Sequence, residues 1–193
     1  MKNLKGKKIG VALTGSFCTF DTALECIEEL IKNGAEVTAI LSEAASELNT
    51  KFGRADTLKI KLAQITKREV ITTIPAAEPI GPKRLLDALL VLPATGNTLA
   101  KITAGIADTP VSFAVKSHLR NGGAVILGIS SNDALGNGAK NIGHLLNAKN
   151  IYFVPFGQDD CVAKPRSMVF KKEYVVSAVC DALDGRQIQP LLA

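Results

Sequence analysis

Residues 8–41 read KIGVALTGSFCTFDTALECIEELIKNGAEVTAIL, and their pattern decides the fold. The stretch begins and ends with apolar runs rich in β-forming residues, at positions 8–13 and 36–41, and each run predicts a strand. The residues between them can form a helix, as a right-handed crossover between two parallel strands requires. The beginning of the chain therefore predicts a strand–helix–strand unit.

The helix of this unit is predicted from the spacing of its apolar residues. Asp21 belongs to the residue types that cap the amino end of a helix, and Gly34 is well placed to end it. One face of the predicted helix carries the apolar side chains of Leu24, Ile27, Leu30 and Ile31.

Strands and helices alternate along the rest of the chain. Continuous apolar runs at residues 88–92, 124–129 and 151–154 are typical of parallel strands that are covered on both faces. Ser167 is expected to start a last helix, with Gly185 just beyond its final turn. The other expected segments are helices at 43–69, 99–107, 111–119 and 139–147, a short strand at 70–74 and a proline-rich connection at 75–82.

This order of elements predicts a single α/β domain over residues 1–193. Its architecture is expected to be a three-layer α/β/α sandwich, Rossmann-like (flavodoxin-like), with a mostly parallel sheet. A hydrophobic content of 47% supplies ample material for one buried core, and no internal repeat or linker interrupts the series.

The composition argues against nucleic-acid and membrane partners. The formal net charge is +5, aromatic residues make up 5%, and there is no Trp to stack on bases. The lysines are scattered, apart from an amino-terminal group of Lys2, Lys5, Lys7 and Lys8. No apolar run approaches the roughly 20 residues of a membrane span, and the amino terminus does not resemble a signal peptide, so a cytoplasmic protein is expected. The positive excess would suit a small anionic ligand.

The cysteines and histidines predict no metal site. The cysteines form no CxxC pair and have no histidine at metal-ligand spacing, so free thiols in a reducing compartment are expected at Cys18, Cys26, Cys161 and Cys180. His118 and His144 lie in predicted helices without a telling acidic or cysteine partner, and we interpret both as structural.

Small polar residues follow four of the predicted strands. They are TGSFCT at 14–19, Ser42, PATGNT at 93–98 and SSND at 130–133. Ligands of parallel α/β sheets bind outside the carboxyl ends of the strands, which is where these residues fall. Neutral hydroxyls and the backbone N–H groups at helix starts bind phosphate well. We therefore predict a pocket for a phosphate-bearing ligand at this edge of the sheet.

The loop at 14–19 is the predicted phosphate-binding loop. It matches neither GxxxxGK[ST] nor GxGxxG, which disfavours both a magnesium–nucleotide site and the common dinucleotide site. A monophosphate cofactor such as FMN fits the loop better. Taken alone, each of the four loops can also be a plain turn or helix cap.

The stretch at residues 156–167 is too polar for the core and too long for a tight turn. Lys164 and Arg166 within it could bind a carboxylate substrate, and Arg166 could do so with two hydrogen bonds. A solvated loop that ends at a helix cap on Ser167 is the alternative interpretation.

The sequence PATGNT at 93–98 resembles the PASANT signature of the homo-oligomeric flavin-containing cysteine decarboxylase family. The Thr-Gly-Ser loop and Ser42 are similar to that family's contacts with the FMN phosphate. Resemblance to one branch of the family extends over nearly the whole chain. It is carried by KGKKIG at 5–10, LTGS at 13–16, AEPIGPK at 77–83, GISSNDALG at 128–136 and FGQDD at 156–160.

The resemblance implies an FMN cofactor. In the family, the residues that match Gly15, Ser16 and Ser42 hold the phosphate, and those that match residues 95–98 and Ser130 surround the ribityl chain and the flavin ring. The cofactor-binding residues expected on this basis are Gly15, Ser16, Phe17, Ser42, Thr95, Gly96, Asn97, Thr98 and Ser130.

The branch also implies a reaction and partners. Its members are the second (B) subunits of an enzyme that oxidises dihydrodipicolinate to dipicolinate, the pyridine dicarboxylate of bacterial endospores. The first (A) subunit of that enzyme is the expected partner and is expected to use NADP or NAD, and the setting is the cytoplasm of the mother cell. The family's assemblies are built from trimers, so self-association is expected.

No residue stands out as a catalytic base. Asn97 and Asn132 are the candidates for orienting the ring or the substrate, and Asn132, Lys164 and Arg166 are the candidates for binding a dicarboxylate. The proton acceptor is expected to be water or a group of the partner chain.

Two departures from the family pattern leave alternatives open. Pro79 stands where decarboxylase members have a catalytic histidine, and Asn132 alone is left of their PxMNxxMW substrate motif. Both departures argue against decarboxylation by the usual family route. An FMN-dependent decarboxylase is nevertheless one alternative, and a non-catalytic regulatory subunit with the same fold is another.

Overall fold

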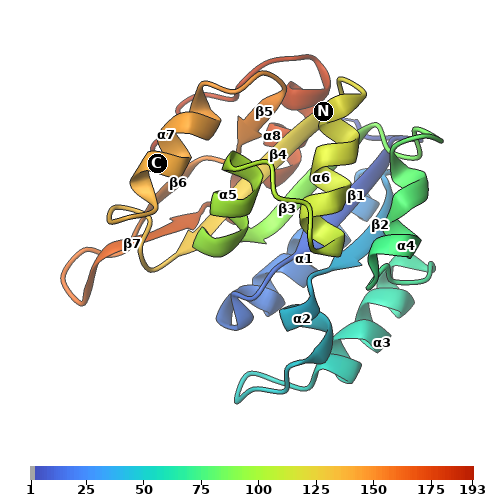
Figure 1. Ribbon diagram of the computed structural model, residues 1–193, viewed down its shortest axis with the longest axis horizontal. Coiled ribbons are helices and arrows are strands. Elements are labelled where there is room, and N and C mark those ends of the chain that lie inside the picture. The colour runs from blue at the N-terminus through green and yellow to red at the C-terminus, as the bar shows by residue number, and fades with distance from the viewer. Residues whose placement is uncertain (1–2) are drawn as a thin grey trace.

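The five apolar runs of the sequence form parallel strands of one seven-stranded sheet (Figure 1). The structure is a computed structural model that describes residues 3–193. The order of strands in the sheet is β2-β1-β3-β4-β7-β6, and β5 also pairs with β4. The parallel strands are Lys8–Leu13 (β1), Glu36–Leu41 (β2), Ala88–Ala94 (β3), Ala124–Ser131 (β4) and Ile151–Phe153 (β5).

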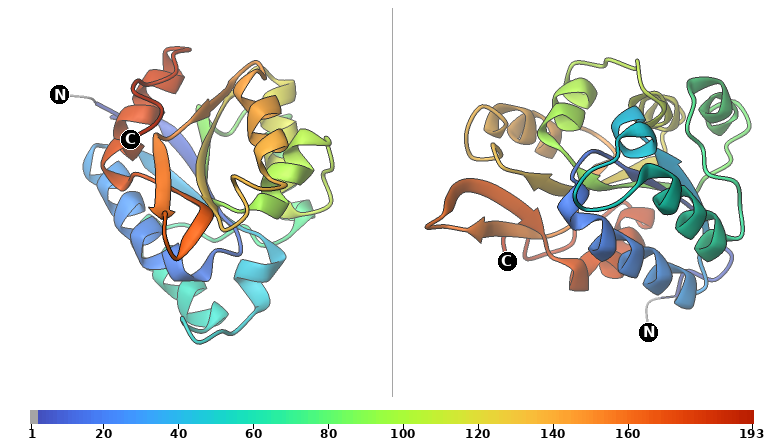
Figure 2. Two further views of the ribbon diagram at one scale, coloured as in Figure 1. Left: turned by 90° about the vertical axis from the view of Figure 1, so that its left-hand side faces the viewer. Right: turned by 90° about the horizontal axis from the view of Figure 1, so that it is seen from below.

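Helices cover both faces of the sheet, as the predicted three-layer architecture requires (Figure 2). The α1, α3 and α8 helices pack on one face, and α4, α5, α6 and α7 pack on the other. The α-helices span Phe20–Lys32 (α1), Glu43–Glu47 (α2), Ala55–Thr66 (α3), Ile74–Ala77 (α4), Gly96–Thr103 (α5), Pro110–Arg120 (α6), Ala139–Leu146 (α7) and Val175–Leu183 (α8).

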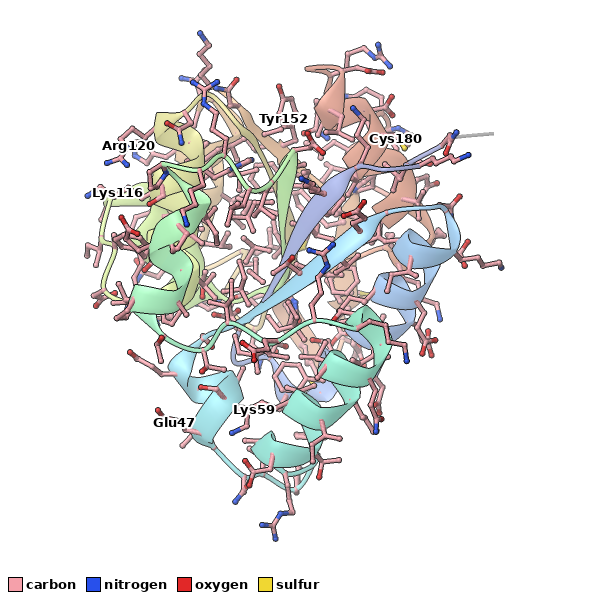
Figure 3. All side chains as sticks on the ribbon, turned by 90° about the vertical axis from the view of Figure 1, so that its right-hand side faces the viewer. Glu47, Lys59, Lys116, Arg120, Tyr152 and Cys180 are labelled. Carbon is pink, nitrogen blue, oxygen red and sulfur yellow. The ribbon has the colours of Figure 1, made fainter. Side chains whose placement is uncertain are left out.

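The β3 strand holds the two helical layers together. All of its residues are buried, because neighbouring strands and helices cover it on every side. Side chains alternate between the faces of a strand, so Leu89 and Val91 join the core under α6, while Leu90 and Leu92 join the core under α1 and α8. Burying one Leu side chain completely stabilises the folded protein by about 1.5–3 kcal/mol relative to leaving it exposed. Charged side chains point outward instead, as Glu47 does (Figure 3).

The first strand–helix–strand unit confirms the predicted strands and corrects the start of the helix. Asp21 is not the cap: α1 begins at Phe20, one turn of 3-10 helix precedes it, and Asp21 lies in the first turn. There its negative charge interacts favourably with the positive end of the helix dipole. Gly34 has a φ of +94° and follows the last turn, as expected for a residue that ends a helix.

The predicted strand at 70–74 is a single bridge. Ile71 exchanges backbone hydrogen bonds with Ala39 and Leu41, but its neighbours do not extend the ladder. The proline-rich connection contains two short helices, α4 and Glu78–Ile80 (η2). Thr73 caps α4 and a proline occupies its first turn, where no backbone donor is needed, so this segment can be helical despite its prolines.

The stretch at 156–167 is neither a solvated loop nor the start of a helix, which corrects the alternative interpretation of a loop that ends at a helix cap on Ser167. It forms an antiparallel hairpin of Phe156–Asp160 (β6) and Lys164–Phe170 (β7), which extends beyond the helical layers (Figures 1 and 2). Ser167 lies in β7, and Met168 and Phe170 are buried there because β7 pairs with the end of β4. The last helix begins only at Val175, after the 3-10 turn Lys172–Tyr174 (η3).

The last described residues of the chain lie beside the start of β6. Leu191 and Ala193 make backbone hydrogen bonds to Phe156, so the last described residues cover the base of the β6 edge. Among residues 3–193, no helix has the length and apolarity that crossing a bilayer demands.

His118 is a buried histidine near the end of α6. Its side chain is 4% exposed, and the ring packs against the backbone of Gly123, where any larger residue would overlap it. Nε2 has no hydrogen-bond partner among the described residues. Burial lowers the pKa of His118, and this effect outweighs the opposing influence of the Ala124 backbone and the Asp87 carboxylate.

We expect the free energy of unfolding to decrease as the pH falls below about 6.5, the ordinary pKa of histidine. The unfolded chain then binds a proton that native His118 takes up only at lower pH, so stability is lost between these two values. Urea titrations at pH 7.5, 6.0 and 5.0 measure how the free energy of unfolding depends on pH. His118→Gln should reduce this dependence, whereas His144→Gln, at an exposed position of α7, should not. If the free energy of unfolding depends on pH equally in the two variants, His118 is not the cause of the loss of stability.

Candidate functional site

The loops that follow β1, β3 and β4 meet at the carboxyl ends of these strands. Ser16 and Ser130 are 114 positions apart, yet their hydroxyl oxygens lie 2.8 Å from each other. Ser16 follows β1, and Ser130 is the second-last residue of β4. The fold therefore joins two residues that the sequence predicts as cofactor contacts.

Thr14 fixes the β1 loop to the loop after β3. Its hydroxyl is buried, donates to the carbonyl of Pro93 at 2.7 Å and accepts from the backbone N–H of Thr95 at 3.1 Å. Thr95 in turn caps α5, because its hydroxyl accepts from the N–H of Thr98 at 3.4 Å. A buried hydroxyl with both bonds made holds the two loops in one geometry.

A cleft of about 480 Å³, which we name the main cleft, opens beside these loops. Its inner wall comes from the β1, β3 and β4 loops, and its far wall comes from the β6–β7 hairpin. Of the residues predicted from sequence, it is lined by Gly15, Ser16, Phe17, Thr95, Gly96, Ser130, Asn132 and Lys164.

A second cavity of about 300 Å³, the side pocket, lies on the other side of Gly15 and Thr95, which line both cavities. Ser42 lies here and caps α2, with its hydroxyl accepting from the N–H of Ala45 at 3.3 Å. The pocket also holds the predicted residues Asn97 and Thr98 and the hydroxyls of Thr109 and Ser112 from the start of α6. The predicted cofactor contacts are thus divided between two adjoining cavities.

The two candidate catalytic amides differ in position. Asn97 does not line the main cleft; with Asn132 it lines a neighbouring hollow of about 430 Å³. Asn132 also faces the main cleft, where its Oδ1 accepts from the Ser167 hydroxyl at 3.4 Å. Asn132 is therefore the one of the two that faces the main cleft.

The two candidate carboxylate-binding cations differ in position. Lys164 lines the main cleft, with Nζ 2.7 Å from Oδ2 of Asp159 on the opposite strand of the hairpin. Asp159 raises the pKa of Lys164, which keeps the ammonium charged. Arg166 is exposed and is not among the residues that line the main cleft; its Cδ lies towards Gly136 instead.

Several residues that line the main cleft are not predicted as site residues from the sequence. The sequence predicts a helix cap at Ser167, but this residue is 3% exposed and forms part of the far wall. Asp159 and Phe52 also line the cleft, Phe52 from the loop between α2 and α3. The polarity of the 156–167 stretch is a usable signal for Asp159 and Ser167, whereas nothing local marks Phe52.

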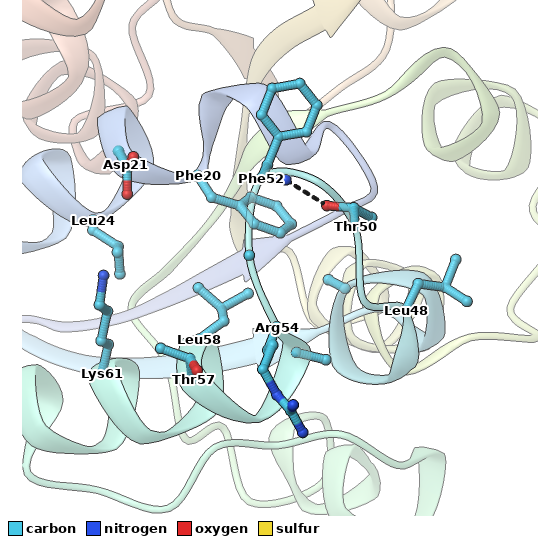
Figure 4. Close-up of a pocket in the computed structure, with 13 residues that line it drawn as sticks. Phe20, Asp21, Leu24, Leu48, Thr50, Phe52, Arg54, Thr57, Leu58 and Lys61 are labelled. Carbon is cyan, nitrogen blue, oxygen red and sulfur yellow. Dashed lines mark hydrogen bonds between the residues drawn. The ribbon is translucent and has the colours of Figure 1, made fainter.

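Phe52 also borders a small hollow of about 60 Å³ under its own loop (Figure 4). The close-up shows Phe20 beneath the loop and the hydroxyl of Thr50 accepting from the backbone N–H of Phe52, at 3.1 Å. Leu24 and Leu58 complete an apolar floor. At about 60 Å³, this hollow is too small for a phosphate-bearing cofactor.

The lining of the main cleft and the side pocket fits a phosphate-bearing cofactor. Their volumes fall in the range of about 300–1,000 Å³ that small-molecule sites occupy. The polar groups are mainly neutral hydroxyls, amides and helix starts, which donate to an anion without a counter-charge. Gly96 lies close to the end of β4, since a Cβ there would approach the Ser131 hydroxyl to 2.9 Å and would require that side chain to shift.

Pro79 lies outside this site. It is part of η2, and the carbonyl of Gly81 just beyond it accepts from the Asn121 side chain, immediately before β4 begins. The segment is therefore near the amino ends of the strands, at the opposite edge of the sheet from the main cleft.

Comparisons with known proteins agree with this architecture. The model of the Flavoprotein family matches residues 1–179. The chain is 44% identical over 192 residues to the B subunit of dipicolinate synthase from Bacillus subtilis, a match that covers 100% of this chain and 96% of the relative. The crystal structure of the dipicolinate synthase B subunit from Bacillus halodurans superposes with a TM-score of 0.91 at 42% identity, covering 99% of this chain and 98% of that one.

A more distant structure shares only the fold. The FMN-dependent cysteine decarboxylase SpaF superposes with a TM-score of 0.70 at 19% identity, over 94% of this chain and 97% of that one. The family match spans nearly the whole sheet and every loop of the site, and two relatives align with the chain from end to end. The chain belongs to the Flavoprotein family.

Proposed function

We propose that the chain acts as the B subunit of a dipicolinate synthase and contributes to the nicotinamide-dependent oxidation of dihydrodipicolinate to dipicolinate. The observation that carries the proposal is the end-to-end relationship, at 44% identity, to a protein of that name. The hydroxyl-rich main cleft at the strand ends supports it, because it offers neutral donors to a small anionic ligand.

We further propose that the two cavities hold FMN together. Gly15 and Ser42 would bind the phosphate from the side pocket, and Ser16, Thr95 and Ser130 would surround the rest of the cofactor in the main cleft. Bound FMN would supply a ring that accepts and returns electrons. The protein's part is to orient that ring, and the Thr14 bridge keeps the two binding loops at a fixed distance for this purpose.

The substrate would bind at the hairpin side of the main cleft. Asn132 and Ser167 offer an amide and a hydroxyl, and Lys164 offers a cation for a carboxylate. Oxidation removes a hydride and a proton from the dihydropyridine ring. In this proposal the hydride equivalent ends on NAD or NADP bound to the partner chain, the A member of the synthase, and water or a group of that partner takes the proton. The setting is the mother-cell cytoplasm, and the chain self-associates in a trimer-based assembly.

The first test is dipicolinate formation from freshly generated dihydrodipicolinate with NAD or NADP. We expect the mixture of this chain and its nicotinamide-dependent partner to produce dipicolinate faster than either alone. Asn132→Ala should slow the mixture about tenfold or more, since a positioned polar contact to the ring or carboxylate is lost. Asn147→Ala, beyond the end of α7, is the matched control and should leave the rate unchanged.

Other results of this assay separate the alternatives. If the nicotinamide-dependent partner is fully active by itself although the two chains form a complex, this chain is a non-catalytic subunit. If the isolated chain releases carbon dioxide from a carboxylate substrate, it is a decarboxylase despite Pro79. Either result would overturn the proposed oxidation role.

The cofactor proposal has its own test. We expect FMN to bind the purified chain, measured by quenching of flavin fluorescence during titration. Gly96→Ala should weaken binding about tenfold, or about 1.4 kcal/mol, because the added methyl group meets the Ser131 hydroxyl and narrows the main cleft. Gly143→Ala, where a Cβ meets nothing within 4 Å, should bind FMN like the unsubstituted chain. Equal affinity in the two variants would argue against FMN in this cleft.

A further inference from the structure

Among the residues described, the charged side chains that line the main cleft are Asp159 and Lys164. They face each other across the β6–β7 hairpin, with Nζ and Oδ2 2.7 Å apart. Every other polar side chain of the lining is a hydroxyl, a thiol or an amide. The charge that the main cleft presents to a ligand therefore depends on this one pair.

The hairpin directs Asp159, and not its neighbour, to Lys164. The Asp160 carboxylate accepts from the backbone N–H groups of Val162 and Ala163, at 3.0 and 2.8 Å, and so closes the turn. Regular pairing stops beyond Gln158 and resumes at Asp160, so Asp159 lies opposite a bulge in β7. Bulges redirect side chains, which explains why Asp159 and Lys164 both face the main cleft.

This pair can open when a ligand arrives. The side chains of Lys164 and Asp159 are 56% and 38% exposed, and ion pairs as exposed as this are weak. A ligand carboxylate that reaches Lys164 must replace Asp159 or share the ammonium with it. In the second case two like charges lie within a few ångströms, which disfavours the ligand.

We propose that Asp159 is a specificity-determining residue: it neutralises Lys164 and so limits how much negative charge a ligand can bring into the main cleft. One ligand carboxylate exchanges with Asp159 at Lys164, and further negative charge meets only neutral groups and the displaced Asp159 carboxylate. The extension to dicarboxylates rests on the proposed function, whereas the effect on the charge of the cleft does not.

A thiol in the main cleft allows the charge to be measured without any substrate. Cys18 lines the same cleft and is exposed. Its rates of alkylation by iodoacetate, an anion, and iodoacetamide, a neutral reagent, form a ratio from which the thiolate fraction cancels. Burial raises the pKa of the Cys26 thiol to about 12, so Cys26 stays unreactive, and peptide mass spectrometry separates Cys18 from Cys161 and Cys180.

The two halves of the pair should change this ratio in opposite directions. We expect Asp159→Asn to raise the iodoacetate-to-iodoacetamide ratio at Cys18 about threefold or more, and Lys164→Gln to lower it similarly, at low salt. Asp56→Asn removes the acid of another exposed ion pair, with Lys59 on α3, and should leave the ratio unchanged. If the ion pair only stabilised the hairpin, both substitutions would change the alkylation ratio in the same direction, and that result would overturn the proposal.

Ligand binding by calorimetry completes the test, with pyridine-2,6-dicarboxylate and its neutral dicarboxamide as probes. Asp159→Asn should tighten binding of the dicarboxylate about tenfold and leave the dicarboxamide unchanged. If the dicarboxylate binds but the substitution does not alter its affinity, the specificity role of Asp159 is wrong and the proposed function stands. If the alkylation ratios shift as expected but no variant binds the dicarboxylate, the role of Asp159 stands and the proposed substrate is wrong.

Discussion

The second half of β4 imposes the constraint on which the site depends. β4 is eight residues long, whereas its parallel neighbour β5 has three and pairs only with the first half. Backbone groups left over at the end of β4 need partners, since unpaired buried groups are costly. The antiparallel strand β7 supplies these partners, because it pairs with Ser130 and Ser131 of β4. The β6 strand is paired with β7 and so lies at the same place. Without this pairing the main cleft would have no far wall.

The same constraint explains which parts of the fold the sequence predicts. The apolar runs and the helix at residues 20–32 follow local periodicity, and the structure confirms them with small changes at their ends. The hairpin does not follow local periodicity, because polar residues such as Gln158 and Asp160 occupy its exposed part. Its stability comes from β4, which lies far away in the sequence. Local pattern therefore predicts a helix cap at Ser167, where a strand forms.

The site divides in a similar way. Residues such as Ser16 and Ser130 can be found from sequence because ligands bind at the carboxyl ends of parallel strands, and that rule needs only the strand ends. Arg166 is a candidate by its charge alone, and the bulge in β7 leaves it on the exposed side. Phe52 and Asp159 reach the main cleft through loop and hairpin geometry. The type of a residue suggests which chemistry it can perform, but only the tertiary structure shows whether the residue reaches the main cleft.

The shared boundary at Gly15 and Thr95 has a consequence for stoichiometry. The main cleft and the side pocket adjoin there, and each has polar groups of its own. A long ligand that extends past this boundary takes up both compartments, so one molecule binds per chain. Two short ligands can instead occupy the compartments simultaneously, because neither reaches the groups used by the other. A free anion in the side pocket would then compete with the long ligand but be compatible with a short one in the main cleft.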